Sequence, residues 1–175
     1  KQQMEAFAQA RLRWFQGRTD ELQRLTRFID STDEKSPRLA VVAAVPGQGK
    51  SALLANWAAR YRQAHPDALV LQHYIGATPY SADWAAMLRR IMGEFKRRLG
   101  IQLVIPDNPL ALRNVFPNSH HMAAARGRVV IVLDALNQLD DRDGALDNND
   151  GSLSATNLDI SNFATTQFSI LPNNL

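Results

Sequence analysis

The chain has 175 residues, of which 45% are hydrophobic and 21% are charged, and it contains no cysteine. This length and composition suit one globular domain, and the lack of cysteine excludes disulfides and thiolate metal sites. The net charge of +3 does not indicate nucleic-acid binding, and with no apolar run near the roughly 20 residues of a membrane span we expect a soluble, cytoplasmic protein that contacts no membrane.

The first predicted unit, residues 1–36, is a helical lead-in. Leu22 and Leu25 begin an apolar stripe at helical spacing, which indicates an amphipathic helix. Thr19 or Asp20 would cap its N-terminus, because both side chains can accept hydrogen bonds from free backbone N–H groups.

A glycine-rich loop follows the first predicted strand. Residues 46–51 read Pro-Gly-Gln-Gly-Lys-Ser, after an apolar run that predicts a strand over residues 38–43 and before a stretch that predicts a helix to about Ala64. A strand, a glycine loop and a helix in this order are typical of a phosphate-binding P-loop. The P-loop pattern wants glycine where this chain has Ala44, so we expect an adjusted first turn.

The residue types of this loop suit phosphate chemistry. Glycines let backbone N–H groups turn toward phosphate oxygens, and the helix adds its positive N-terminal end. Lys50 would reach the β- and γ-phosphates, and the Ser51 hydroxyl would ligate magnesium. We therefore predict a nucleoside triphosphate with Mg²⁺ as the ligand. The predicted nucleotide-binding residues are Gly47, Gln48, Gly49, Lys50, Ser51 and Ala52.

Two further elements follow the P-loop helix. Residues 69–74 predict a strand, and residues 84–99 carry an apolar stripe at helical spacing with Ser81 or Asp83 as the cap. We expect the basic residues opposite that stripe to face solvent, as is usual on an amphipathic helix. These residues are Arg89, Arg90, Lys96, Arg97 and Arg98.

A helix and an apolar strand complete the predicted core, residues 37–145. Residues 107–109 read as a helix cap with proline in the first turn, and Pro117 is expected to interrupt or restart that helix. Residues 128–134 form an apolar run without alternation, which is typical of a buried parallel strand. In a P-loop enzyme this strand would lie beside the P-loop strand, and Asp134 at its end would hold the magnesium ion.

Hydrolysis also requires a group that orients the attacking water and often accepts its proton. After Asp134 the chain continues Ala-Leu-Asn-Gln, so Asn137 and Gln138, with Asp140 as a substitute further on, are the candidates for positioning water. Amides cannot accept a proton at neutral pH. The sequence therefore predicts slow turnover.

Residues 146–175 differ in composition from the core. No Lys or Arg follows Arg142, whereas Asn, Ser, Thr and Asp are dense. The segment is compatible with a flexible tail, an addition to the natural chain, or short polar strands such as residues 158–160 and 167–170. These alternatives stay open at the level of sequence.

Four segments resemble the STAND signal-transduction NTPases, specifically NACHT-like domains of the telomerase-associated-protein and nephrocystin type. They are residues 15–22, the P-loop, residues 73–77 with the helix after them, and residues 133–139. The resemblance implies an α/β P-loop NTPase fold, a three-layer sandwich with a mostly parallel central sheet. It also implies that Arg18 lies near the nucleotide, and a plain Gly-Arg turn before a helix is the equal alternative.

The same resemblance implies a switch that binds ATP or ADP with Mg²⁺. ATP, rather than GTP, is the choice that the family favours. Slow hydrolysis would control self-association, or contacts with sensor and effector domains of a longer chain. The family's next strand carries a polar or basic sensor residue, and nothing basic follows Arg142, so we expect a core that is truncated on its C-terminal side.

Two other functions fit the same residues. A nucleotide-dependent interaction module without hydrolysis is favoured by Ala44, Asn137 and Gln138. A P-loop phosphotransferase would need an acceptor pocket and an arginine lid, for which Arg113 and Arg126 form no recognisable pattern. Binding and turnover of ATP by the same protein distinguish the first two functions.

Overall fold

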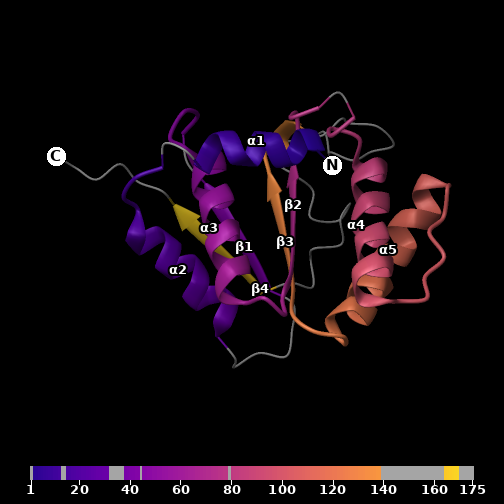
Figure 1. Ribbon diagram of the computed structural model, residues 1–175. Helices are drawn as coiled ribbons and strands as arrows, with labels where there is room; N and C mark the ends of the chain where they lie inside the picture. The colour runs from indigo at the N-terminus through magenta and orange to yellow at the C-terminus, as the bar shows by residue number, and fades with distance from the viewer. Residues whose placement is uncertain are drawn as a thin grey trace.

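The computed structural model describes residues 2–12, 15–31, 38–43, 45–78, 80–138 and 164–169. Helices and strands alternate along much of the chain (Figure 1), which is the pattern of an α/β fold. The helices are α1 (Gln2–Leu12), α2 (Thr19–Asp30), α3 (Lys50–Ala64), α4 (Trp84–Leu99) and α5 (Pro109–Ala124). The strands are β1 (Arg38–Ala43), β2 (Leu69–Tyr74), β3 (Val129–Asp134) and β4 (Ala164–Ser169), and the short 3₁₀ helix η1 (Leu136–Gln138) follows β3.

The strands form two parallel pairs. β1 pairs with β4, with Arg38 opposite Ala164, and β2 pairs with β3, with Leu69 opposite Val129. The predicted parallel α/β architecture is confirmed, but the prediction that β3 lies beside the P-loop strand is wrong for these pairs. An apolar run indicates that a strand is buried. Which strand it pairs with depends on packing against segments that are distant in the sequence.

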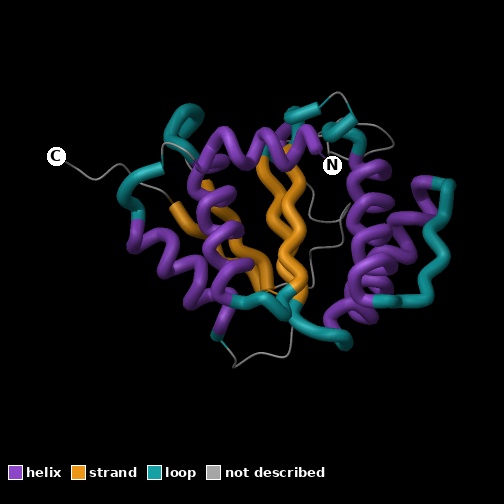
Figure 2. The backbone as a smooth tube through the Cα atoms, in the orientation of Figure 1, coloured by secondary structure: helices purple, strands orange, loops and turns teal. Residues whose placement is uncertain are grey.

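Two clusters of buried side chains cover the two faces of the β2–β3 pair. Leu69 and Leu71 pack with α4 and α5, whereas Val70 packs with α2 and α3, because successive side chains of a strand point to opposite faces. The β2–β3 pair is therefore the middle of three layers, with α2 and α3 on one face and α4 and α5 on the other (Figure 2). Val130 and Val132 of β3 are buried on the α3 side, and Val129, Ile131 and Leu133 are partly buried against the other cluster. The prediction of a parallel strand covered on both faces is therefore confirmed.

The helix α2 begins without the predicted side-chain cap. Its N-cap residue is Arg18, which has a left-handed backbone (φ 55°), and no side chain caps the helix. Thr19 and Asp20 both lie inside the first turn. There the negative charge of Asp20 interacts favourably with the positive N-terminal end of the helix. The prediction of Thr19 or Asp20 as cap is wrong by one residue, because the left-handed turn at Arg18 places the boundary earlier.

The caps of the two helices on the other face agree with expectation. The Ala86 N–H donates to Asp83 Oδ1 over 2.9 Å, and the Ala111 N–H donates to Asn108 Oδ1 over 3.0 Å. Pro117, however, lies inside the continuous helix α5, so the predicted interruption is wrong. Packing of α5 against α4 keeps the helix intact despite the missing N–H.

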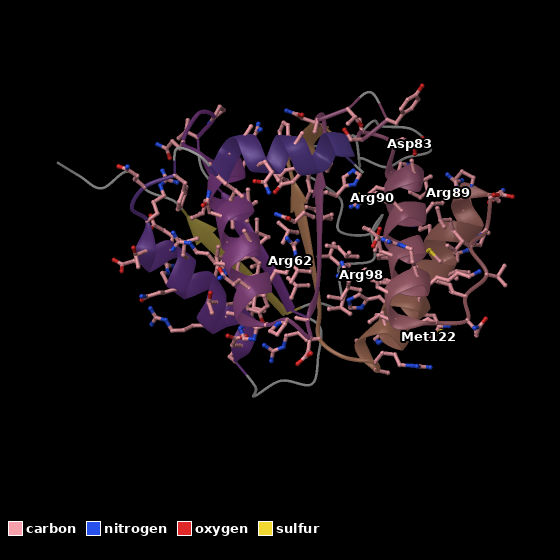
Figure 3. The ribbon with its side chains drawn as sticks, viewed as in Figure 1. Arg62, Asp83, Arg89, Arg90, Arg98 and Met122 are labelled. Carbon is pink, nitrogen blue, oxygen red and sulfur yellow. The ribbon has the colours of Figure 1, made fainter. Side chains whose placement is uncertain are left out.

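Among the basic residues of α4, Arg90 makes hydrogen bonds within the fold and is not a solvated charge. Arg90 donates from Nη2 to the Gln72 carbonyl over 2.7 Å and from Nε to His73 Nδ1 over 3.2 Å, and Figure 3 shows it extending from α4 toward β2. Arg89 donates to the Asp107 carbonyl over 2.5 Å. Lys96 and its two neighbours in the last turn are exposed as predicted.

The Arg90 contact fixes the protonation state of a buried histidine. Arg90 can only donate, so His73 Nδ1 accepts, and the ring hydrogen on Nε2 donates to the Ser81 carbonyl over 2.9 Å. Burial lowers the pKa of His73, and the nearby Arg90 charge lowers it further, against an opposing effect of the Ser81 hydrogen bond. The neutral ring therefore ties β2 to α4 and to the loop after β2.

We expect the protein to lose stability as the pH falls below about 6.5, the ordinary histidine pKa. There the unfolded chain binds a proton at His73 that the folded protein resists, because the folded pKa is lowered. The free energy of unfolding by urea should therefore be lower at pH 5.0 than at pH 7.5.

The decrease should be smaller in His73→Gln, whose amide keeps a donor for Ser81 but does not titrate. His121→Gln is the matched control because His121 is exposed, and it should behave like the wild type. An equal pH dependence in His73→Gln and the wild type would contradict this role.

Within the described ranges, no helix is both long and apolar enough to cross a membrane. Of the two polar strands predicted near the C-terminus, residues 167–170 overlap β4, whereas residues 158–160 lie outside the described residues.

Candidate functional site

The predicted P-loop forms the turn between β1 and α3. Gly47 and Gly49 have positive φ angles of 85° and 73°, which alanine adopts only with strain. The Gln48 N–H donates to the Val45 carbonyl over 3.3 Å, and the Leu53 N–H donates to the Gly49 carbonyl over 2.9 Å as α3 begins. The loop therefore leads directly into a helix N-terminus, the arrangement that binds anions. Ala44, where the pattern wants glycine, lies outside the described residues.

Lys50 is the first residue of α3, followed by Ser51 and Ala52 in the first turn. The Lys50 ammonium donates to the Val45 carbonyl over 3.2 Å in a solvent-exposed contact, so the side chain folds back over the loop. A charge held over the loop in this way can reach a phosphate bound by the loop N–H groups.

Asp134 ends β3 as a buried carboxylate, with only 5% of the residue exposed. Its backbone carbonyl accepts the Ile75 N–H over 3.1 Å. A buried charge is costly unless a cation or donor compensates it. Figure 1 shows the end of β3 and the start of α3 toward the same end of the molecule.

The oxygen chemistry at this end fits magnesium. Mg²⁺ prefers one or two carboxylates with waters and phosphate oxygens, and the Asp134 carboxylate and Ser51 hydroxyl are ligands of that kind. The described residues contain no group of three or more His, Cys, Asp or Glu that could hold a metal ion. A magnesium ion here would therefore share its coordination with phosphate and water.

Tyr74 is a neighbour of Asp134 that the sequence did not mark. It lies opposite Asp134 in the strand register and is buried. Burial above all, and then the Asp134 charge, raise the pKa of Tyr74 to about 12. Its hydroxyl accepts from Gln72 Nε2 over 2.7 Å, and Arg62 in turn donates to Gln72 Oε1 over 3.1 Å. In the sequence, Tyr74 is one residue of a plausible core strand, because the strand pairing that brings it to Asp134 is long-range.

The N-terminal helix α1 closes over this group. The Phe7 and Tyr74 rings lie 5.1 Å apart, and Asn56 Nδ2 on α3 donates to the Arg11 carbonyl over 3.3 Å. Figure 1 shows α1 crossing near the ends of β2 and β3. The first helix therefore contacts both the P-loop helix and the neighbour of the buried carboxylate.

Two buried side-chain atoms, one in the P-loop and one at the start of α2, lack hydrogen-bond partners among the described residues. Gln48 Oε1 and Arg18 Nη1 are both buried atoms of this kind. Phe15, close to Arg18 in the chain, packs in the same cluster as Leu53 in the first turn of α3. An unpaired donor and an unpaired acceptor are both groups that a polar ligand can satisfy.

The residues predicted to position water lie at and beyond η1. Ala135 has a positive φ of 61°, which redirects the chain, and the Gln138 N–H then donates to the Ala135 carbonyl over 2.8 Å. Asn137 lies in η1 without a described side chain, and Asp140 lies outside the described residues. Gln138 is therefore the predicted water-positioning residue whose side chain the structure places.

Comparison with known proteins agrees with a P-loop domain. The sequence model of the AAA ATPase domain family matches residues 15–146. Nephrocystin-3 of Mus musculus and of Homo sapiens are each 27% identical over 143 residues, which is 79% of this chain and 11% of the relative. A TPR repeat-containing protein of Dictyostelium discoideum is 37% identical over 73 residues, 42% of this chain and 4% of the relative.

The chain thus spans only a small part of the length of these relatives. No solved structure matches the chain significantly. The family match covers most of the chain, including the P-loop and Asp134, and the family implies a nucleotide-binding function. The chain belongs to the AAA ATPase domain family of P-loop NTPases.

Proposed function

We propose that this chain is the ATP- and magnesium-binding switch domain of a STAND-class, NACHT-like signal-transduction NTPase with slow hydrolysis. One observation carries the proposal: a P-loop with two positive-φ glycines starts α3 toward the same end of the molecule as the buried carboxylate of Asp134. A phosphate with its magnesium ion suits both features, since the loop offers donors and the carboxylate needs a cation.

Each predicted site residue has a distinct part in this proposal. Lys50 would leave the Val45 carbonyl for the β- and γ-phosphates, and the N–H groups of residues 47–52 would hold the β-phosphate. Ser51 and Asp134 would hold magnesium, which when bound neutralises phosphate charge. Arg18 would use its unpaired Nη1 atom toward the nucleotide.

The regulatory part of the proposal rests on similarity. Nephrocystin-3 is similar over 79% of this chain, and two relatives are named for TPR or tetratricopeptide repeats. We infer that this domain works beside repeat domains of a longer chain, with ATP and ADP favouring different contacts. A ligand shifts such an equilibrium only if it binds the two states with different affinity.

A nucleotide-dependent interaction module without hydrolysis is the second candidate. It is favoured by Gln138, the one predicted water-positioning residue with a described side chain. An amide can orient water but cannot take its proton. Both candidates require ATP binding, and they differ only in turnover.

We expect the protein to bind ATP with magnesium and to release phosphate more slowly than about one per second, below the usual range of dedicated enzymes. The measurements are fluorescence anisotropy of a labelled ATP analogue and steady-state phosphate release by the same preparation. A faster rate would contradict slow hydrolysis, binding without release would favour the second candidate, and no ATP binding would overturn both.

A further inference from the structure

The loop after β2 and the turn after β3 meet at a glycine. Gly76 has a φ of 78°, and a Cβ added to it would lie 2.0 Å from Oε1 of Gln138. Atoms of real side chains do not approach so closely, so the carboxamide oxygen fills space that exists only because residue 76 has no side chain. The oxygen lies on the side of the Cα hydrogen that a Cβ would replace, where weak Cα–H···O contacts form.

The backbone holds both partners of this contact in place. Ile75, just before the glycine, donates its N–H to the Asp134 carbonyl over 3.1 Å, and the Ala77 N–H donates to the Tyr74 carbonyl over 3.3 Å. On the other side, the left-handed turn at Ala135 and the bond from the Gln138 N–H to its carbonyl fold η1 back. The contact therefore joins two strand ends that are already paired.

The remainder of the loop is braced as well. Ser81 donates its hydroxyl to the Thr78 carbonyl over 2.7 Å and accepts the Thr78 N–H over 2.9 Å. The Ser81 carbonyl accepts from buried His73 over 2.9 Å. A loop tied down on both sides of residue 76 cannot easily shift away from an added side chain, so the side chain of Gln138 would have to move instead.

We propose that Gly76 is a positioning residue that holds the Gln138 carboxamide at the end of β3, where the amide orients the water that attacks the γ-phosphate. The inference rests on the proposed function.

In the hydrolysis step, the water oxygen bonds to the γ-phosphorus while the bond from phosphorus to the bridging oxygen breaks. ADP leaves with that electron pair, one proton stays on the released phosphate and the other passes to solvent. Gln138 takes no proton.

The first test compares two glycines of similar backbone. Gly100, at the end of α4, has a φ of 63°, and a Cβ added there meets nothing within 4 Å. Gly76→Ala and Gly100→Ala therefore introduce similar backbone strain, but only the first displaces Gln138. We expect Gly76→Ala to lower kcat for ATP roughly tenfold with KM nearly unchanged, as for loss of a contact made in the transition state. Gly100→Ala should keep both constants.

The second test adds the missing base. In Gln138→Glu the carboxylate has the same length as the amide and can accept the water proton, so we expect kcat to rise about tenfold or more, because general bases contribute at least that much. Gly76→Ala in this background should abolish the gain, whereas Gly100→Ala should preserve it. This cycle remains informative when Gly76→Ala alone lowers the yield of folded protein.

The outcomes separate the inference from the function beneath it. No ATP binding by the wild type overturns the proposed function. Suppose that the wild type binds and hydrolyses ATP. Equal kcat in both glycine variants, or no gain in Gln138→Glu, would then overturn the role of Gly76 but would not contradict the nucleotide site. Binding without any turnover overturns the positioning of water, since there is then no attack to orient.

Discussion

Replacement of Lys50 by alanine is expected to weaken ATP binding by about 10- to 100-fold. The ammonium would make charge-assisted hydrogen bonds to the β- and γ-phosphates, and a net loss of roughly 1.5–3 kcal/mol, as for one hydrogen bond to a charged group, corresponds to this decrease in affinity. The fold should survive, because the contact of Lys50 with the Val45 carbonyl is exposed to solvent. Fluorescence anisotropy of a labelled ATP analogue with magnesium measures the change.

Lys96→Ala is the matched control for this prediction. Lys96 is exposed in the last turn of α4, and its removal changes the net charge by the same amount. Its ATP affinity should equal that of the wild type. Unchanged affinity in Lys50→Ala, with an intact fold, would contradict both the switch and the interaction module, since both need a P-loop that binds phosphate.

Replacement of Asp134 by asparagine is expected to remove most of the effect of magnesium on ATP binding. Asparagine has nearly the same shape as aspartate but no charge, so a magnesium ion loses its anionic ligand. We expect the gain in ATP affinity on adding magnesium to fall by roughly tenfold, which corresponds to about 1.4 kcal/mol. Titrations with magnesium and with a chelator, on both proteins, measure this gain.

The burial of Asp134 supplies a second observable. Without metal the wild type has an aspartate residue that is only 5% exposed, and a buried charge is costly. The thermal midpoint of Asp134→Asn without magnesium should therefore be equal to that of the wild type or higher. Asp67→Asn, in an exposed turn before β2, is the control and should keep the full magnesium effect. A variant that binds ATP and magnesium as the wild type does would exclude Asp134 as the metal ligand.

The two predictions test opposite sides of the site. Lys50 acts on phosphate whether or not a metal is present, whereas Asp134 acts only through the metal. Loss of affinity in Lys50→Ala together with loss of the magnesium effect in Asp134→Asn would support one shared nucleotide site. Loss in only one variant would show that the other residue serves the fold.

Local features of the sequence were enough for the elements that build the site. The strands predicted over residues 38–43 and 69–74 have those bounds in the structure, and α3 ends at Ala64 as expected. Apolar runs, positive-φ glycines and a proline after His65 restrict the backbone through neighbouring residues alone. Such signals can be recognised without knowing what the segment packs against.

Features that depend on distant segments could not be found in this way. Pro117 is tolerated because α5 packs against α4, and Arg90 is partly buried because His73 and the Gln72 carbonyl accept its hydrogen bonds. In the sequence, Arg90 is simply one of several basic residues on the polar face of an amphipathic helix. Burial and partners of a polar side chain follow from tertiary packing, which periodicity does not encode.

The sequence by itself determined the P-loop and the strand that ends in Asp134, and it predicted the chemistry of both, because residue type and spacing decide which groups can bind phosphate and magnesium. Only the tertiary structure decided that β3 pairs with β2, that Tyr74 lies opposite Asp134 and that Gln138 lies against Gly76. The physical reason is strand pairing: it joins residues far apart in the chain, and its register is set by packing on both faces of the sheet.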